Sequence, residues 1–331
     1  MKNEIVTIGG ATEDIAIHTN ECVLIDNKKD VLRQKLVGFE YGAKVKVNYA
    51  KSSFGGGAAN VAVALSRLGF KTSALIAVGD DERGTRLLKN LAKENVNISL
   101  VQKIKNQLTG FSPIVVCPDN ERITFSVRGA NENLNITNEV LKKISDSKWL
   151  FITSLSGDKK NWIDNLNKIF SIKNVKIAWN PGHLQLDEGH KVLGRYLNNT
   201  ELLIVNIDEA RELIVSHSSY DKQEASILGN VNELLKIISS WGPKIVVITM
   251  GKEGAVAFDG KKIYKISANK KIKQVNTVGV GDSFGASIVA GLELYNYDIT
   301  KAMNLGKINT SSVISKDGAQ LGLIYKKDIY T

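Results

Sequence analysis

The chain alternates over most of its length between short apolar runs and longer segments with apolar residues at helical spacing. The alternation is most regular after residue 137, where apolar runs at 149–153, 176–179, 202–205 and 245–249 each follow an amphipathic segment. Short apolar runs between helices are typical of buried parallel strands, which side chains cover on both faces. We therefore predict an α/β fold with a doubly wound, mostly parallel sheet flanked by helices.

The remaining apolar pattern predicts further strands and the helices. A buried first strand is predicted at 3–10, and further strands at 72–78 and 98–103. A short β ribbon is expected at 255–266, after the last parallel strand. The helices are predicted at 82–94, 137–144, 159–170, 189–197, 207–216, 230–241 and 299–316.

Two other regions show an alternation between polar and apolar residues. Residues 15–25 and 43–49 predict half-exposed strands, and residues 109–129 predict a hairpin that turns at 118–121. Such strands are too polar for the centre of a parallel sheet. We predict that 15–49 and 109–129 form a small antiparallel lid, and that 1–14, 50–108 and 130–331 form the main domain.

A glycine-punctuated turn precedes an apolar helix near the C-terminus. Gly279 and Gly281 allow the backbone to turn tightly and to approach a ligand closely. The helix expected from Asp282 directs its unpaired N–H groups and its positive dipole end at this turn, which favours an anion such as phosphate. A carboxylate repels an anion, so Asp282 predicts a different task, the removal of a proton from an attacking hydroxyl. A purely structural role in the first turn of the helix is the alternative.

Candidate functional residues fall at the ends of several predicted strands. Asp14, the glycine-rich segment 55–60, Asn206, Gly251 and the turn at 279–282 each follow a strand or lie in such a turn. Ligands of doubly wound sheets bind at the carboxyl ends of the strands. The coincidence predicts one binding region along this edge.

The composition argues against several classes of protein and site but does not indicate a function. The chain has 331 residues, 43% hydrophobic residues and a mean hydropathy of −0.10, and no apolar run approaches the roughly 18 residues of a membrane span. The start of the chain does not resemble a signal peptide. Two cysteines, Cys22 and Cys117, predict a reducing, cytoplasmic setting without a disulfide framework. The four histidines have no metal-ligand spacing.

The net charge of +10 raises the question of a nucleic-acid partner. Only eight of the 44 basic residues are arginine, and the lysines are scattered. The arginine guanidinium forms paired hydrogen bonds with bases and phosphates better than the lysine ammonium does, so no nucleic-acid partner is expected. The charge would still attract an anionic co-substrate.

Three other enzyme classes fit the sequence poorly. The segment Gly281-Asp-Ser-Phe-Gly285 matches a hydrolase nucleophile elbow, but every histidine precedes Ser283, whereas that fold requires one after it. The first strand–helix turn lacks the glycine spacing of a dinucleotide site. The chain also has no Gly-x4-Gly-Lys-Ser/Thr loop for a nucleotide.

Two motifs together resemble the signatures of the ribokinase-like (PfkB) carbohydrate kinases. They are Gly-Gly-Gly-Ala-Ala-Asn-Val-Ala at 55–62 and Thr-Val-Gly-Val-Gly-Asp-Ser-Phe at 277–284, in the order and separation of the family. The resemblance implies a doubly wound domain with a β lid, and transfer of the γ-phosphoryl group of ATP, with Mg²⁺, to a hydroxyl of a small carbohydrate such as ribose or fructose. It also implies that Asp282 is the general base and that N–H groups of Gly279 to Asp282 stabilise the transferring group.

The resemblance assigns the other candidate residues one by one. Asp14, Gly56, Gly57 and Asn60 would hold substrate hydroxyls, although a backbone partner for Asn60 is equally plausible. Glu209 would lie near Mg²⁺, although its place in a first helical turn has a structural explanation too. The nucleotide-binding residues implied by the resemblance are Asn206, Thr249, Gly251, Gly254, Val280, Asn309 and Gly318.

Several points stay open at this stage. Asn276 and Val280 stand where the family often has Asp and Ala, and the loss of the charge at 276 leaves a nearby monovalent cation in doubt. The substrate is a sugar or, as the alternative of the same fold, a nucleoside. A non-catalytic sugar-binding regulator is a further alternative, against which Asp282 argues. A homodimer formed through the lid is suspected from the resemblance alone.

Overall fold

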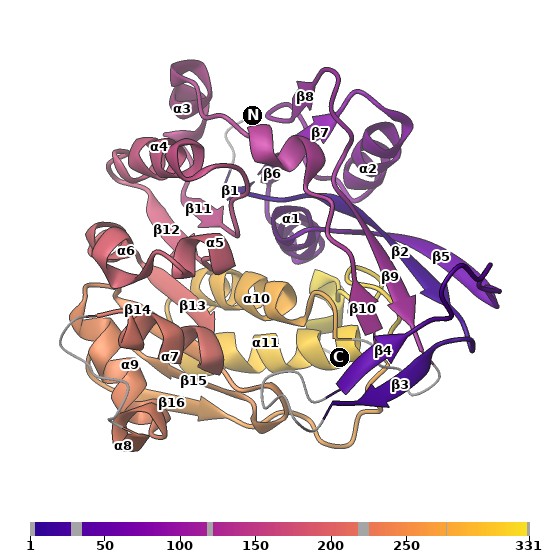
Figure 1. The fold of residues 1–331 in the computed structure, drawn as a ribbon. Helices are drawn as coiled ribbons and strands as arrows, with labels where there is room; N and C mark the ends of the chain where they lie inside the picture. The colour runs from indigo at the N-terminus through magenta and orange to yellow at the C-terminus, as the bar shows by residue number, and fades with distance from the viewer. Residues whose placement is uncertain (1–3, 28–34, 118–121, 218–224, 276, 330–331) are drawn as a thin grey trace.

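The centre of the molecule is an eight-stranded sheet (Figure 1). The computed structural model describes residues 4–27, 35–117, 122–217, 225–275 and 277–329. Six strands run parallel and two antiparallel strands extend one edge. Their order is β6 (Thr72–Leu75), β1 (Ile5–Ile8), β11 (Trp149–Ile152), β12 (Lys176–Trp179), β13 (Leu202–Asn206), β14 (Ile245–Thr249), β15 (Ala255–Phe258) and β16 (Ile263–Ile266).

Helices cover both faces of this sheet, and this confirms the predicted fold class. Neighbouring residues of one strand face opposite cores: Ile5 belongs to one apolar cluster and Val6 to the other. One face packs against α1 (Gly57–Arg67), α2 (Glu82–Lys93), α10 (Val280–Leu294) and α11 (Ile299–Ile314). The other packs against α3 (Asn138–Ile144), α4 (Lys159–Phe170), α5 (His183–Leu186), α6 (Gly189–Leu197), α7 (Ile207–Val215) and α9 (Val231–Ser240), with α8 (Ala225–Leu228) packed on α9.

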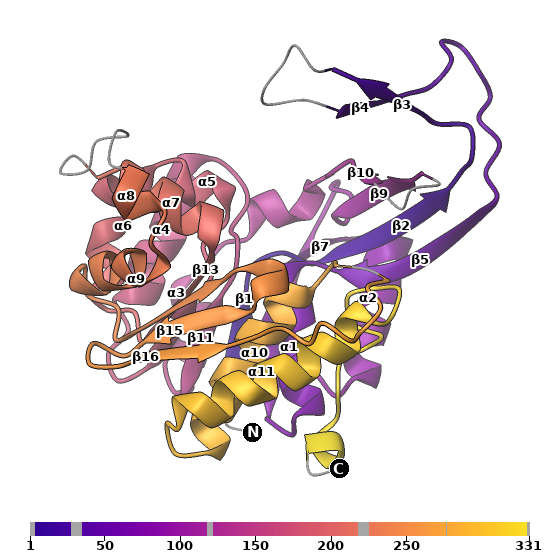
Figure 2. The ribbon, with the colours of Figure 1, turned by 90° about the horizontal axis from the view of Figure 1, so that it is seen from below.

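A second sheet of four strands leans over one end of the first (Figure 2). Its order is β10 (Arg122–Thr124), β9 (Phe111–Val116), β2 (Thr12–His18) and β5 (Tyr49–Gly55). We call these four strands, with the hairpin described next, the lid. β2 pairs antiparallel with β5 but parallel with β9, so this sheet is not purely antiparallel as predicted. The predicted division into two domains stays a prediction, and Asp14 lies on a lid strand.

Two lid strands differ from the prediction. Residues 43–48 are not a strand; the strand begins at Tyr49, where the chain can pair with His18 of β2. The alternating segment 15–25 contributes to β2 and to a separate strand, β3 (Val23–Asp26). β3 pairs with β4 (Lys35–Gly38) in a hairpin that projects away from the main sheet (Figure 2). An alternating pattern indicates a strand but not the strand with which it pairs. The pattern alone therefore does not show whether these strands form one sheet or two. The turn predicted at 118–121 lies outside the described residues.

The expectation of no disulfide is wrong in this structure. Cys22, just before β3, and Cys117, just after β9, form a disulfide with a Cα–Cα distance of 6.1 Å. The two residues are 95 positions apart in the sequence, so only the pairing of the lid strands brings them together. The bond ties the segment that leads into the projecting hairpin to the four-stranded lid sheet.

Two smaller features complete the fold. The strand predicted at 72–78 is divided into β6 and β7 (Ala77–Gly79), and the strand predicted at 98–103 is wrong over 98–101, where only β8 (Gln102–Ile104) follows. β7 pairs parallel with β8 beside the main sheet. Short 3-10 turns occupy Gly129–Asn133, Gly251–Glu253 and Lys326–Ile329. Among the described residues, none of the helices has the length and apolar character needed to cross a bilayer.

Candidate active site

The turn before α10 leaves three backbone donors without a helical acceptor. Gly279 is the N-cap residue with φ 76°, and it has no side chain to cap the helix. A Cβ on this residue would lie 2.7 Å from the Cβ of Ala319. The position therefore requires glycine for two reasons, the left-handed backbone and the lack of room for a side chain. The first bond of the helix runs from the Ser283 N–H to the Gly279 carbonyl, at 2.9 Å. The N–H groups of residues 280–282 therefore form an anion-binding end.

Asp282 lies in this first turn, and a side-chain amide holds it. The Asn60 amide on α1 donates to Asp282 Oδ2 at 2.9 Å. Burial raises the pKa of Asp282, the hydrogen bond from Asn60 lowers it, and the negative charge of Asp14 raises it. The net direction is upward from the ordinary value, because desolvation disfavours the charged form. A carboxylate that gains from accepting a proton is suited to general-base catalysis.

Asp14 projects from β2 at the base of the lid. Its side chain is buried, and the Thr12 hydroxyl donates to Asp14 Oδ1 at 3.1 Å. Burial raises the pKa of Asp14, while hydrogen bonds from Ser112 and Thr12 lower it. We call the hollow beside Asp14 the lid cleft. The residues that line it are Asp14, Ala16, Lys51, Ser53, Ile114, Val116, Arg122, Val278, Asp317, Gly318 and Ala319.

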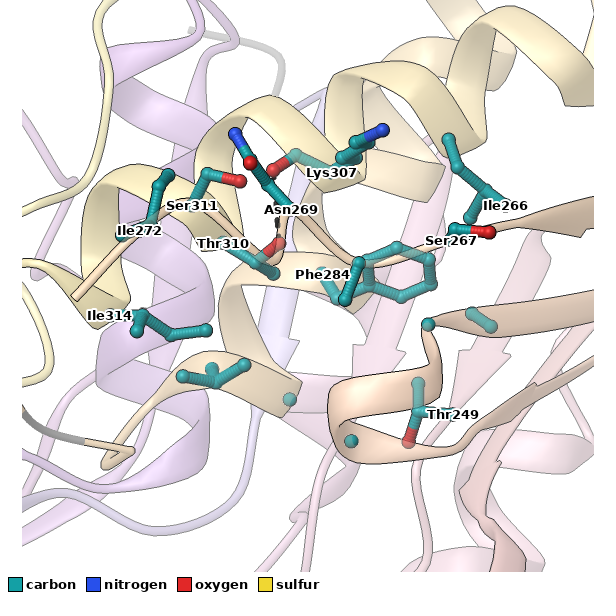
Figure 3. Close-up of a pocket in the computed structure, with 16 residues that line it drawn as sticks. Thr249, Ile266, Ser267, Asn269, Ile272, Phe284, Lys307, Thr310, Ser311 and Ile314 are labelled. Atoms are coloured by element: carbon teal, nitrogen blue, oxygen red, sulfur yellow. Dashed lines mark hydrogen bonds between the residues drawn. The ribbon is translucent and has the colours of Figure 1, made fainter. Parts of the chain in front are cut away.

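A larger hollow, the helix cleft, lies on the other side of the turn (Figure 3). It contains about 690 Å³ of empty space, part of it open to solvent. In Figure 3 the Phe284 ring lies at the centre of the labelled side chains, with Thr249 on one side and Ile314 on the other. The lining comprises Thr249, Gly251, Gly254, Ala255, Ile266, Ser267, Ala268, Asn269, Ile272, Val280, Gly281, Phe284, Lys307, Thr310, Ser311 and Ile314.

Four predicted nucleotide residues therefore line one cleft: Thr249, Gly251, Gly254 and Val280. Gly281 lies beside them, and an added Cβ there would meet no atom within 4 Å. The turn also connects the two clefts, because Val278 lines the lid cleft while Val280 and Gly281 line the helix cleft. Asp282 is the next residue along this turn. The roles of these residues stay predictions.

Asn206 and Glu209 meet at the start of α7, at the carboxyl end of β13. The Asn206 side chain accepts hydrogen bonds from the N–H groups of Asp208 and Glu209, and Glu209 Oε2 accepts from the Asn206 N–H at 2.8 Å. This reciprocal capping box is the structural explanation of the pair. Burial raises the pKa of Glu209, and the backbone N–H of Asn206 lowers it. Among the described residues, no group of three or more His, Cys, Asp or Glu side chains could bind a metal ion.

Three other predicted residues, Asn309, Gly318 and Gly56, are not among those that line the helix cleft, and their roles stay predictions. Asn309 is fully buried and bonds to Ser287 and to the Ile324 N–H, away from the lining of the helix cleft. Gly318 lines the lid cleft instead of the nucleotide side. Gly56, with φ 89°, packs against Ala11, where a Cβ would lie 2.5 Å from the Ala11 Cα.

Three further predicted features have clear positions. Gly57 begins α1 beside Thr153, and neither Gly56 nor Gly57 is among the residues that line the lid cleft. Ser283 is 1% exposed and its hydroxyl donates to the Val280 carbonyl, which is no environment for a nucleophile. Asn276 lies outside the described residues.

Much of both cleft walls was missed by the sequence reasoning. Phe284, Lys307, Thr310 and Ser311 come from α10 and α11, and Asn269 from the segment after β16. Lys51 and Arg122 come from lid strands and line the lid cleft. Apart from Phe284, which ends the motif at 277–284, these residues belong to no motif, and only the packing of the elements brings them together.

The comparisons with known proteins agree with this geometry. The model of the pfkB family of carbohydrate kinases matches residues 19–325. Mouse ribokinase is 27% identical over 282 residues, which are 83% of each chain. The structure of Arabidopsis thaliana ribokinase complexed with ribose and ATP superposes with a TM-score of 0.79 at 17% identity, covering 100% of this chain and 98% of that one.

A nucleoside kinase is similar to a comparable degree. The Methanocaldococcus jannaschii nucleoside kinase, an archaeal member of the ribokinase family, superposes with a TM-score of 0.77 at 22% identity and covers 99% of this chain and 97% of that one. At these identities the superpositions establish the fold, whereas the family match spans almost the whole chain. The chain belongs to the pfkB family of carbohydrate kinases and is a phosphotransferase with an alcohol group as acceptor.

Proposed function

We propose that the protein transfers the γ-phosphoryl group of ATP to a hydroxyl of a small sugar bound in the lid cleft, with Asp282 as general base. One observation supports the proposal most: the turn before α10 borders both clefts. Val278 lines the lid cleft, Val280 and Gly281 line the helix cleft, and Asp282 follows. A donor in one cleft and an acceptor in the other would meet at the anion-binding end of α10.

The chemistry follows from this arrangement. Asp282 takes the proton of the acceptor hydroxyl while the hydroxyl oxygen forms a bond to the γ-phosphorus. The bond from that phosphorus to the bridging oxygen breaks, and ADP leaves with its electron pair. The N–H groups of residues 280–282 stabilise the transferring phosphoryl group. Phosphoryl transfer depends mainly on positioning and charge stabilisation, which this rigid helix end supplies.

The helix cleft fits a nucleotide. It combines an apolar wall at Phe284, Ile272 and Ile314 with polar groups at Thr249 and Lys307. Mixed linings of this kind are typical of cofactor sites. For Mg²⁺, Glu209 fits as a carboxylate with one oxygen outside the capping bond. Mg²⁺ is commonly held by one or two carboxylates with nucleotide phosphates, and there it neutralises phosphate charge.

The lid cleft fits a polyhydroxy acceptor. Asp14 and Asp317 supply hydrogen-bond acceptors, and Lys51 donates to Asp317 at 3.1 Å. Ala16, Ile114 and Val116 supply an apolar surface from the lid. That surface also favours a second candidate, a nucleoside whose base packs on the lid, in keeping with the similarity to a nucleoside kinase.

Coupled ADP release distinguishes the two candidates. Purified protein with ATP and Mg²⁺ is mixed with pentoses, hexoses, sugar phosphates and nucleosides in turn. Turnover with one sugar class supports the proposal, and turnover with nucleosides alone supports the second candidate. ATP binding without turnover across the panel would contradict both and point to a non-catalytic sensor.

We also propose a homodimer formed through the lid. The projecting hairpin exposes Val23, Leu24, Ile25 and Leu36 by 42–57% each. Contiguous exposed apolar side chains on a hairpin mark an interaction surface. Sedimentation of the protein should give a dimer, and Leu24→Asp should give a monomer. A monomeric wild type at micromolar concentration would contradict the proposal.

A further inference from the structure

A chain of side-chain amides ends on the carboxylate of Asp282. Asn60 donates to Asp282 at 2.9 Å, Gln320 donates to the Asn60 Oδ1 at 3.1 Å, and Asn90 donates to the Gln320 Oε1 at 2.9 Å. Asn60 is 3% exposed and Gln320 is 8% exposed. The four residues come from α10, α1, the segment after α11, and α2. We call Asn90, Gln320 and Asn60 the amide chain.

The carboxylate fixes the direction of every bond in this chain. An ionised Asp282 only accepts, so Asn60 must present its NH₂ group to it. The Asn60 oxygen then faces Gln320, which must present its own NH₂ group, and its oxygen in turn faces Asn90. The order of donors therefore follows from Asp282 itself. Hydrogen bonds aligned in one direction polarise one another, and the last donor becomes stronger.

The backbone of Gln320, the middle residue of the amide chain, is held by a charged side chain. The Gln320 carbonyl accepts from the Arg67 guanidinium at 2.9 Å, and the same group donates to the Leu323 carbonyl at 2.8 Å. Arg67 also forms a two-pronged pair with Glu94, with both distances at 2.8 Å. These contacts hold the backbone of Gln320 against α1. The glutamine side chain thus approaches Asn60 from a fixed position.

We propose that Gln320 and Asn90 are positioning residues for the general base, because they lock the Asn60 amide with its NH₂ group toward Asp282. Without Gln320, the Asn60 amide can rotate and present its oxygen to the carboxylate. This inference rests on the proposed role of Asp282 as base. It also gives Asn60 a task other than the predicted contact with substrate hydroxyls.

The chemical consequence concerns the charge on Asp282. The Asn60 donor stabilises the ionised form and so counteracts burial and the negative charge of Asp14 on β2, both of which raise the pKa of Asp282. A weaker Asn60 bond would leave Asp282 protonated over a wider pH range. The base would then be lost at pH values where the wild type is active.

The experiment is a pH titration of the Asp282 carboxyl carbon by NMR in ¹³C-aspartate-labelled protein, with the signal assigned by its loss in Asp282→Asn. In Gln320→Leu we expect the midpoint to rise by about one pH unit, as for a tenfold weaker preference for the ionised form. Asn60→Leu should raise it more and Asn90→Leu less. The control is Asn165→Leu, which removes another buried amide, bonded to Ile136 and Leu134 within a different core.

The outcomes separate this inference from the proposed function. An Asp282 midpoint in Gln320→Leu equal to that of Asn165→Leu, in folded protein, would overturn the amide chain. A shifted midpoint with the expected order supports it, whatever the acceptor proves to be. Full turnover in Asp282→Asn would remove the base role itself, and the titration would still report whether the amide chain acts on the carboxyl group.

Discussion

The helices α7 and α10 begin at the same edge of the sheet, but they differ in whether a side chain caps the unpaired backbone N–H groups of the first turn. α7 begins at Asn206 with a complete capping box, in which Glu209 closes the backbone donors from within. α10 begins at Gly279 with no capping side chain, and its acidic residue, Asp282, accepts a hydrogen bond from Asn60 on α1. The first end is locally satisfied, whereas the second leaves its donors for a ligand.

The capped end of α7 contributes stability to the fold, whereas the open end of α10 is available to a ligand. A satisfied cap is worth about 1 kcal/mol of stability, and it needs no partner beyond the helix. An uncapped end with a buried carboxylate costs free energy of folding, which the rest of the fold must offset. The open end together with its acidic residue supports the proposal that phosphoryl transfer takes place at α10.

Replacement of the α10 carboxylate should have the largest effect on activity. Asp282→Asn keeps the volume and still accepts the Asn60 hydrogen bond, but it has no affinity for the acceptor proton. We expect kcat to fall by roughly 10² to 10⁴, the usual share of a general base. Steady-state ADP release on the active acceptor measures this loss. A kcat within about twofold of the wild type would exclude the base role.

Addition of one methyl group at the turn should affect folding and binding separately. Gly279→Ala forces a left-handed residue against Ala319 and should cost about 2 kcal/mol or more of unfolding free energy, measured in urea. Gly281→Ala is the matched control, since its Cβ meets no atom within 4 Å and α10 gains a better helix former. We expect unchanged or higher stability and about tenfold weaker ATP binding there, because the methyl group enters the helix cleft. Equal urea midpoints for the two variants would contradict the account of the turn.

The capping end should respond to loss of the side chain more than to loss of its charge. Glu209→Gln keeps the capping box and should unfold within about 0.5 kcal/mol of the wild type. Glu209→Ala breaks it and should cost about 1 kcal/mol. If Glu209 also binds Mg²⁺, both variants need about tenfold more Mg²⁺ for half-maximal turnover. Unchanged Mg²⁺ dependence in both variants would limit Glu209 to its capping role.

The smallest predicted effect is on stability at neutral pH. The pKa of Asp282 is raised in the folded protein, so its contribution to stability is fully present only below the ordinary carboxyl pKa and is lost as pH rises through the raised value. At pH 7 the buried charge is therefore unfavourable, and Asp282→Asn should raise the Tm by about 2 °C. The gain should vanish near pH 3. A lower Tm at pH 7 would mean that the carboxylate is net stabilising there.

The sequence predicted the main sheet well, for identifiable reasons. The strands at 149–152, 176–179, 202–206 and 245–249 are short apolar runs between amphipathic helices, and each is observed at nearly the predicted bounds. These signals are local, since they depend on neighbouring residues in the chain.

The rest depends on contacts between distant segments. The disulfide of Cys22 with Cys117 and the division of the lid into a sheet and a projecting hairpin have no local signal. The bond between Asn60 and Asp282 spans 222 positions, and Gln320 lies 260 positions from Asn60. The resemblance predicts that Asn309 on α11 binds the nucleotide, but its observed partners are Ser287 and the Ile324 N–H. Side-chain partners of this kind become visible only in the folded chain.

The pH dependence of kcat/KM, measured in the wild type and in Asp282→Asn, tests the central claim most directly. The wild type should lose activity as the pH falls, with an apparent pKa above the ordinary range of an aspartate, because burial raises the pKa of Asp282. The residual activity of the variant should lack this acidic limb. An identical acidic limb in both proteins would show that another group accepts the proton and would contradict the account.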